Sequence, residues 1–249
     1  MIETAAAPYR QNRAPWGWRE MGAVLALTAI ALSLIFTVLA LVIRALGIDG
    51  DIESDPAGIA ILLMGQALLD AAAVGIAAGF SLGKYGLSPA AWGLVRPPKL
   101  DIWWILGGLF LCYVGLSAYT AITTGLGIEW LEPQDNVPTE FFDHRAVVPL
   151  AVFLVVIVAP LAEEMFFRGF LFHGLWGRIG FWPAAIGSGF IFSVIHVSSS
   201  DFIGLVIPFT FIGTLFAFVV GRTGSLWNSI AIHFLFNSIG MIANFASGS

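Results

Sequence analysis

The fold class is decided by residues 21–43, which read MGAVLALTAIALSLIFTVLALVI and contain no charged side chain. A helix of this length spans about 35 Å at about 1.5 Å per residue, enough to cross the hydrocarbon core of a bilayer. Of the 249 residues, 58% are hydrophobic and 11% are charged, whereas about 25% are charged in a typical soluble domain. The sequence therefore predicts an integral membrane protein and excludes an ordinary soluble enzyme.

Six further apolar segments follow along the chain. Together they predict an all-α fold, a polytopic transmembrane helical bundle, with spans near 21–43, 59–83, 102–124, 147–162, 181–197, 202–220 and 225–245. The fourth segment continues beyond residue 162 as a helix. No linker is long enough to separate domains, so we expect a single integral-membrane domain over residues 1–249.

Basic residues are distributed unevenly between the two sides of this bundle. Nine of the eleven Lys and Arg residues lie before the first span or in every second connection after it. By the positive-inside rule we expect the N-terminal segment, residues 1–20, to be cytoplasmic in a multi-pass protein of the plasma membrane. The net charge of −5 and the scattered basic residues argue against nucleic acid as a partner. The single cysteine, Cys112, cannot form an intrachain disulfide.

Polar side chains inside the apolar segments require an explanation, because an ionisable group at mid-bilayer costs about 2.5–3.5 kcal/mol on insertion scales. They are Asp70, Glu163, Glu164, Arg168, His196 and His233, the last accompanied by Asn237. Asp70 has a structural explanation, since Gln66 lies one helical turn earlier and can donate a hydrogen bond to it.

Residues 160–168 read PLAEEMFFR and place two glutamates side by side. Helical spacing puts Glu164 and Arg168 one turn apart, as in an ion pair, and turns Glu163 about 100° away from them. We therefore expect Glu164 and Arg168 to support the helix and Glu163 to be a general base or acid. The alternative is that all three mark a helix end that reaches the lipid headgroups.

The predicted depths of the polar residues in the membrane favour one shared functional site. If the fourth helix reverses at residues 178–181, Glu163 and His196 face one another, each about 21–24 Å from the turn. His233 and Asn237 share one face of the last span, about 12 and 18 Å from their own turn, and can reach the same cavity. A glutamate with a histidine can deprotonate a water, and a histidine with an asparagine amide can donate to an oxyanion. The set predicts amide hydrolysis by water, in the motif region 147–245.

Three motifs, Glu163-Glu164-x-x-x-Arg168, Phe192-x-x-x-His196 and His233-x-x-x-Asn237, resemble those of the CAAX prenyl protease and bacteriocin-processing family of intramembrane glutamate proteases. The resemblance covers about residues 160–237. It implies that Glu163 is the water-activating base, that His196 is its partner on the water, and that His233 and Asn237 stabilise the oxyanion. Glu164, Arg168 and Phe192 would support them. The family usually has eight helices, so an eighth is expected in the long fourth segment or in residues 84–101.

On this resemblance we expect an intramembrane endopeptidase, a hydrolase without a cofactor, whose substrate is a membrane-associated peptide or protein, lipidated or unmodified, in the lipid bilayer. One alternative is zinc held by Glu163, His196 and His233, although the sequence lacks His-Glu-x-x-His. Another is a non-enzymatic membrane protein, such as a transporter with a proton relay, an immunity protein or a scaffold. The positive-inside count also places the site nearer the outer face, whereas the family implies a cavity that opens to the cytoplasm.

Overall fold

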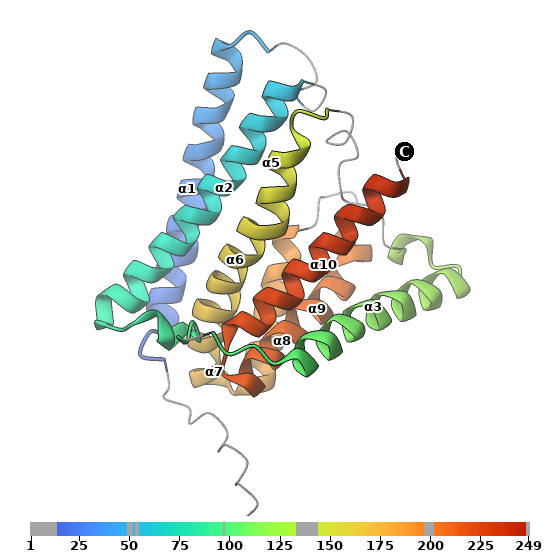
Figure 1. Cartoon of the computed structure of the whole chain (residues 1–249). Helices are drawn as coiled ribbons and strands as arrows, with labels where there is room; N and C mark the ends of the chain where they lie inside the picture. Colours follow the sequence, from blue (N-terminus) through green and yellow to red (C-terminus); the bar gives the residue numbers. More distant parts are fainter. Residues whose placement is uncertain are drawn as a thin grey trace, which may run out of the picture.

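The computed structural model describes residues 14–48, 52, 55–96, 98–132, 144–196 and 202–247, and within these ranges the chain is helical and forms no strand (Figure 1). Six helices are long and apolar enough to cross a membrane: Trp18–Ala45, Pro56–Gly83, Ile102–Gly125, Val148–Ile179, Gly204–Thr223 and Leu226–Ala246. A seventh apolar helix, Phe181–His196, has 16 residues. The predicted polytopic helical bundle is confirmed.

Figure 1 labels the segments of these helices. The first three are α1 (Trp18–Ala45), α2 (Pro56–Ala78, followed by a π-helical turn at Gly79–Gly83) and α3 (Ile102–Gly125). The fourth, long helix runs through α5 (Val148–Phe153), a π-helical segment (Leu154–Val158), α6 (Ala159–Glu163), a second π-helical segment (Glu164–Phe172) and α7 (His173–Ile179). The last three are α8 (Phe181–His196), α9 (Phe202–Thr223) and α10 (Leu226–Ser247).

An eighth span is not found among the residues that the structure describes. The part of 84–101 that it describes holds a short 3₁₀ helix, Pro89–Trp92, which is far too short to cross a bilayer. The long fourth segment is one continuous helix that ends at Ile179. Most of the predicted N-terminal segment, residues 1–13, and the predicted end of the fifth span at residue 197 lie outside the described residues.

The reversal between α7 and α8 lies where the sequence predicts it. Gly180 connects the two helices with a φ of 84°, in the left-handed region that glycine adopts without steric cost. The two helices therefore form a tight hairpin, and α8 packs along the second π-helical segment and against α9. This hairpin fixes which residues of the long helix lie beside the end of α8.

The second π-helical segment offers backbone carbonyls to neighbouring side chains. In a π-helical turn the backbone hydrogen bonds run from residue i to i+5, so the register of the ladder shifts locally. The Phe167 carbonyl accepts from Ser188 Oγ at 2.9 Å, and the Phe170 carbonyl accepts from the indole Nε1 of Trp16 at 2.9 Å. These bonds tie α8 and the residues before α1 to the long helix.

The N-terminal end of α1 is held by contacts with other helices. Trp16 is buried and stacks on Phe170. Glu20 accepts hydrogen bonds from Lys84 Nζ at 2.6 Å and from the Tyr85 hydroxyl at 3.0 Å, just beyond the end of α2. The bond to Glu20 raises the pKa of Lys84 above its usual value. The buried residues of α1 lie near its two ends: Glu20, Met21, Val24 and Ile43.

The helices surround the middle of the long helix. Figure 1 shows α1, α2 and the α5–α6 part of the long helix running side by side, with α10 next to α6 and α3 on the far side of α10. α8 and α9 pack against each other behind α10. Residues from α1, α2, α6, α8, α9 and α10 therefore converge on one region.

Candidate active site

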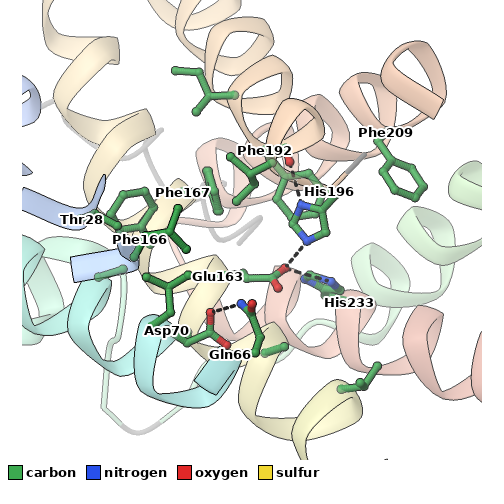
Figure 2. Close-up of a pocket in the computed structure, with 18 of the residues that line it drawn as sticks. Thr28, Gln66, Asp70, Glu163, Phe166, Phe167, Phe192, His196, Phe209 and His233 are labelled. Atoms are coloured by element: carbon green, nitrogen blue, oxygen red, sulfur yellow. Dashed lines mark hydrogen bonds and ion pairs between the residues drawn. The ribbon is translucent and has the colours of Figure 1, made fainter. Parts of the chain in front are cut away.

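Glu163 lies at the middle of the long helix, fifteen residues after Val148 and sixteen before Ile179. Its Oε2 atom is 3.3 Å from Nε2 of His196, the last residue of α8, and 3.7 Å from Nε2 of His233 on α10 (Figure 2). The hairpin thus brings Glu163 and His196 together as their distances from the turn predict. Two imidazoles converge on one carboxylate oxygen.

The expected ion pair between Glu164 and Arg168 is present. Glu164 Oε1 accepts from Arg168 Nη1 at 2.7 Å, and both side chains are fully buried. Arg168 Nη2 donates to the Gly213 carbonyl of α9 at 3.3 Å. Its guanidinium carbon lies 4.5 Å from the ring centroid of Phe192, which places an aromatic face against the charge. This pair is a buried structural element and not a helix end at the headgroups.

Both histidines are oriented through their Nδ1 atoms. Nδ1 of His196 lies 2.7 Å from the Phe192 carbonyl, and Nδ1 of His233 lies 3.2 Å from Glu164 Oε1. A carbonyl and an Arg-paired carboxylate accept hydrogen bonds, so each Nδ1 carries a hydrogen. In a neutral imidazole Nε2 then presents a lone pair towards Glu163. The Nε2 lone pairs and Glu163 Oε2 are all acceptors. This arrangement suits a proton that an imidazole shares with Glu163, or a water that donates hydrogen bonds to both groups.

Phe192 supports both imidazoles. Its ring centroid is 4.2 Å from that of His196 and 5.9 Å from that of His233. It contacts Arg168 as well, so one aromatic side chain fixes the relative positions of both histidines and the buried guanidinium.

Asn237 lies one turn beyond His233 on α10, and both line the same cavity. Its Nδ2 donates to the Val155 carbonyl at 2.9 Å. That carbonyl lies in the first π-helical segment, where the Ala159 N–H donates to the Leu154 carbonyl five residues earlier. The residue five positions after Val155 is Pro160, which has no N–H, so the Val155 carbonyl can accept from Asn237 instead. An asparagine amide has two N–H groups, so a second donor remains for another acceptor.

The site residues border a cavity of about 850 Å³. Its polar lining consists of Thr28, Gln66, Asp70, Glu163, His196, His233 and Asn237. The rest of the lining is apolar, and α1 contributes Leu25, Ala29, Leu32 and Phe36 to it. Among the residues that the structure describes, no Lys or Arg lines this cavity. Glu163 and His196 remain partly accessible, with side chains 12% and 27% exposed, so they can meet a molecule in the cavity.

Asp70 is the polar residue whose position sequence reasoning missed. The expected hydrogen bond is present, since Gln66 Nε2 donates to Asp70 Oδ1 at 2.9 Å. Asp70 nevertheless lines the cavity that holds Glu163, and Figure 2 shows its side chain on the α2 wall, on the opposite side of Glu163 from His196. The sequence offered a local partner for Asp70 but no signal that α2 packs against α6.

The donor types for the zinc alternative are present, since Glu163 and the Nε2 atoms of His196 and His233 are a carboxylate and two imidazoles. Among the described residues, however, no group of three or more His, Cys, Asp or Glu side chains is arranged so that it could hold a metal ion.

Comparisons with known proteins match the part of the chain that contains the candidate site. Residues 145–239 match a family described as Rce1-like, type II CAAX prenyl endopeptidase. The chain is 30% identical over 146 residues to "Putative membrane peptidase YdiL" of Bacillus subtilis (strain 168), an alignment that covers 57% of this chain and 56% of that protein.

A second relative is an uncharacterized protein of Mycoplasma capricolum subsp. capricolum, 28% identical over 144 residues, or 54% of this chain and 41% of that protein. The chain thus spans about half the length of the curated relatives it matches. No solved structure matches. The match at residues 145–239 includes all three sequence motifs.

Proposed function

We propose that the chain, as a member of the CAAX prenyl protease and bacteriocin-processing family, is a membrane peptidase. More specifically, it is an intramembrane endopeptidase that uses water as its nucleophile. The observation that carries the proposal is the convergence of the His196 and His233 Nε2 atoms on Glu163 Oε2 in a cavity at mid-helix depth.

In the proposed reaction Glu163 takes a proton from a water that His196 helps to position, and the hydroxide adds to the carbonyl of the scissile peptide bond. The electron pair of the C=O bond moves to oxygen and forms an oxyanion. When the C–N bond breaks, the proton on Glu163 passes to the leaving nitrogen, which becomes the new amine. Atoms and charges balance with water as the second reactant.

His233 and Asn237 are the proposed donors to the oxyanion. Asn237 has an N–H beyond the one bonded to Val155. His233 would donate from Nε2 in its imidazolium form while Nδ1 keeps its bond to Glu164. Glu164, Arg168 and Phe192 then act by positioning the two imidazoles rather than by touching substrate.

The proposed substrate is a peptide or protein segment that lies in or at the membrane, lipidated or unmodified. The apolar lining contributed by α1 supports this class, because an extended apolar segment would bury its side chains there. The reaction as proposed needs no cofactor. If zinc were bound instead, Glu163, His196 and His233 would hold it, and it would supply an activated water.

We also propose that the N-terminus is cytoplasmic and the protein lies in the plasma membrane. The orientation rests on the basic residues near the N-terminal end of α1 and the helix ends beside it, among them Arg19, Lys84 and Arg178. Glu163 is equally far from both ends of its helix, about 22–24 Å at about 1.5 Å per residue. We therefore propose a site near the middle of the membrane, in place of the position nearer the outer face that the sequence count implies.

The test is cleavage of a peptide library by the full chain reconstituted in lipid vesicles. Wild type should cleave a subset of peptides and Glu163→Gln none, while Glu129→Gln, the same change at an exposed position, should behave as wild type. A wild-type protein that cleaves no peptide, or a Glu163→Gln variant that cleaves normally, would contradict the proposal.

A further inference from the structure

Asp70 is a carboxylate in the cavity that the proposed chemistry does not use. Glu163 faces two imidazoles and Glu164 is paired with Arg168. Within the part of the chain that the structure describes, Asp70 forms one hydrogen bond, from the Gln66 amide, and no ion pair. Among the described residues no Lys or Arg lines the cavity, and the two histidines that do, His196 and His233, face Glu163.

A carboxylate with only a neutral amide for a partner is costly in an apolar surrounding, and a cation that reaches it gains a charge-assisted hydrogen bond. Asp70 is half-buried in the α2 wall, beside the apolar residues Leu69 and Ala73. A bound cation would therefore interact with it more strongly than in water. The cavity is large enough for a peptide side chain to enter beside the main chain.

A second polar side chain that lines the cavity, Thr28, has no hydrogen-bond partner among the described residues. Its hydroxyl oxygen, on α1, is buried. Two other hydroxyls of the same helix behave differently, since Ser33 and Thr37 donate to carbonyls four residues earlier at 3.1 and 2.7 Å. Thr28 and Asp70 therefore offer two acceptor groups on the α1 and α2 side of the cavity.

We propose that Asp70 determines substrate specificity by binding a basic side chain, a lysine ammonium or an arginine guanidinium, that lies near the scissile bond of the substrate. Thr28 supplies a further acceptor to the same group. The inference rests on the proposed function and adds to it the class of peptide that the site selects. A substrate with such a residue would place its cation on the α2 wall and its scissile carbonyl beside Glu163 and His196.

The experiment compares peptides that differ by one charge. Reconstituted full chain is given peptides with lysine or its neutral isostere norleucine at each position around the cleavage site, and the ratio of kcat/KM for the two is measured. Wild type should favour lysine at one position by about tenfold or more, as a charge-assisted bond in a partly dry site allows. Asp70→Asn, which keeps the shape and a partner for Gln66, should bring the ratio close to one, and Thr28→Val should lower it in part.

Asp55→Asn is the matched control, because Asp55 caps the same helix outside the cavity and asparagine caps equally well. It should keep the wild-type ratio. Absence of a lysine preference in wild type, or a preference that survives Asp70→Asn, overturns the inference while the peptidase proposal stands. A protein that cleaves nothing contradicts the peptidase proposal instead.

If the protein cleaves no peptide, a binding measurement still tests the cation site separately from the peptidase proposal. The dissociation constants of the lysine and norleucine peptides are measured on the inactive Glu163→Gln protein, with and without Asp70→Asn. Tighter binding of the lysine peptide that is lost with Asp70→Asn supports the cation site whether or not cleavage occurs. Equal binding of the two peptides overturns it.

Discussion

Asn237 Nδ2 donates to the Val155 carbonyl at 2.9 Å and so joins α10 to the long helix two turns before Glu163. Pro160 explains why this carbonyl is available, because it interrupts the backbone ladder of the long helix. A proline in the motif region therefore creates the acceptor that holds a proposed oxyanion donor in place. Asn237 uses one amide N–H for this anchoring bond, and its second N–H is the proposed donor to the oxyanion.

Asn237→Ala should lower kcat by about a hundred- to a thousandfold with little change in KM, because an oxyanion donor acts mainly in the transition state. Asn237→Asp should be at least as slow, since a carboxylate repels the oxyanion and cannot donate to Val155. Asn244→Ala and Asn244→Asp are the controls, because Asn244 is also on α10 and donates to a backbone carbonyl, that of Gly240, but does not line the cavity.

The same two variants decide between a peptidase and a proton relay. In a relay an aspartate at position 237 can titrate, so it would retain proton-coupled flux better than alanine. Cleavage and flux should both be measured in one vesicle preparation. Flux without cleavage of any peptide, together with a tolerated Asn237→Asp, would end the peptidase account.

Glu163→Gln and Glu164→Gln should fail in different ways. Glu163→Gln should abolish hydrolysis in a folded protein, because the amide cannot accept the proton from water. Glu164→Gln leaves Arg168 charged, buried and unpaired, and breaking such a pair costs about 3–5 kcal/mol. Yield and thermal midpoint in detergent, measured beside activity, should show a loss of stability for Glu164→Gln alone. The reverse pattern would exchange the two roles.

Activity should survive exhaustive chelation. If Glu163 and His196 activate the water without a metal, dialysis against a strong chelator should leave kcat unchanged, and metal analysis should find far less than one zinc per chain. Loss of activity that returns on addition of zinc would instead make Glu163, His196 and His233 ligands.

The bond from Trp16 to the π-helical segment should contribute measurably to stability. Trp16→Phe keeps most of the ring that stacks on Phe170 but leaves a buried carbonyl without its donor, which costs about 1–3 kcal/mol. The denaturation midpoint in detergent should fall accordingly. Trp103→Phe should not change the midpoint, because the Trp103 side chain is exposed. Equal midpoints for the two variants would contradict this role for Trp16.

The sequence predicted those parts of the site that depend on one helix or one hairpin. The Glu164–Arg168 pair follows from helical spacing, and the approach of His196 to Glu163 follows from the turn at Gly180. Both depend on counting residues along regular helices. The π-helical segments do not disturb this register enough to separate Glu163 from His196.

The cavity wall could not be predicted in the same way. Leu25 and Leu32 of α1 are partly exposed and line the cavity, while Leu34 and Leu41 of the same helix are exposed and do not line it. Cavity and lipid both favour apolar side chains, so the sequence pattern does not distinguish the two faces. The packing of α2 against α6, which brings Asp70 to the cavity, is a contact between distant segments and leaves no local signal.

The central claim is that Glu163 and His196 act on one water, and a double-mutant cycle tests it most directly. kcat is measured for Glu163→Asp, whose shorter carboxylate can still accept a proton and leaves a measurable rate, for His196→Ala and for the double variant, all checked for folding in vesicles. Groups that act as a unit lose activity non-additively, so the double variant should be no slower than the slower single variant, each having lost about a hundredfold or more. Losses that multiply in the double variant would mean that the two residues act independently, and would contradict the account.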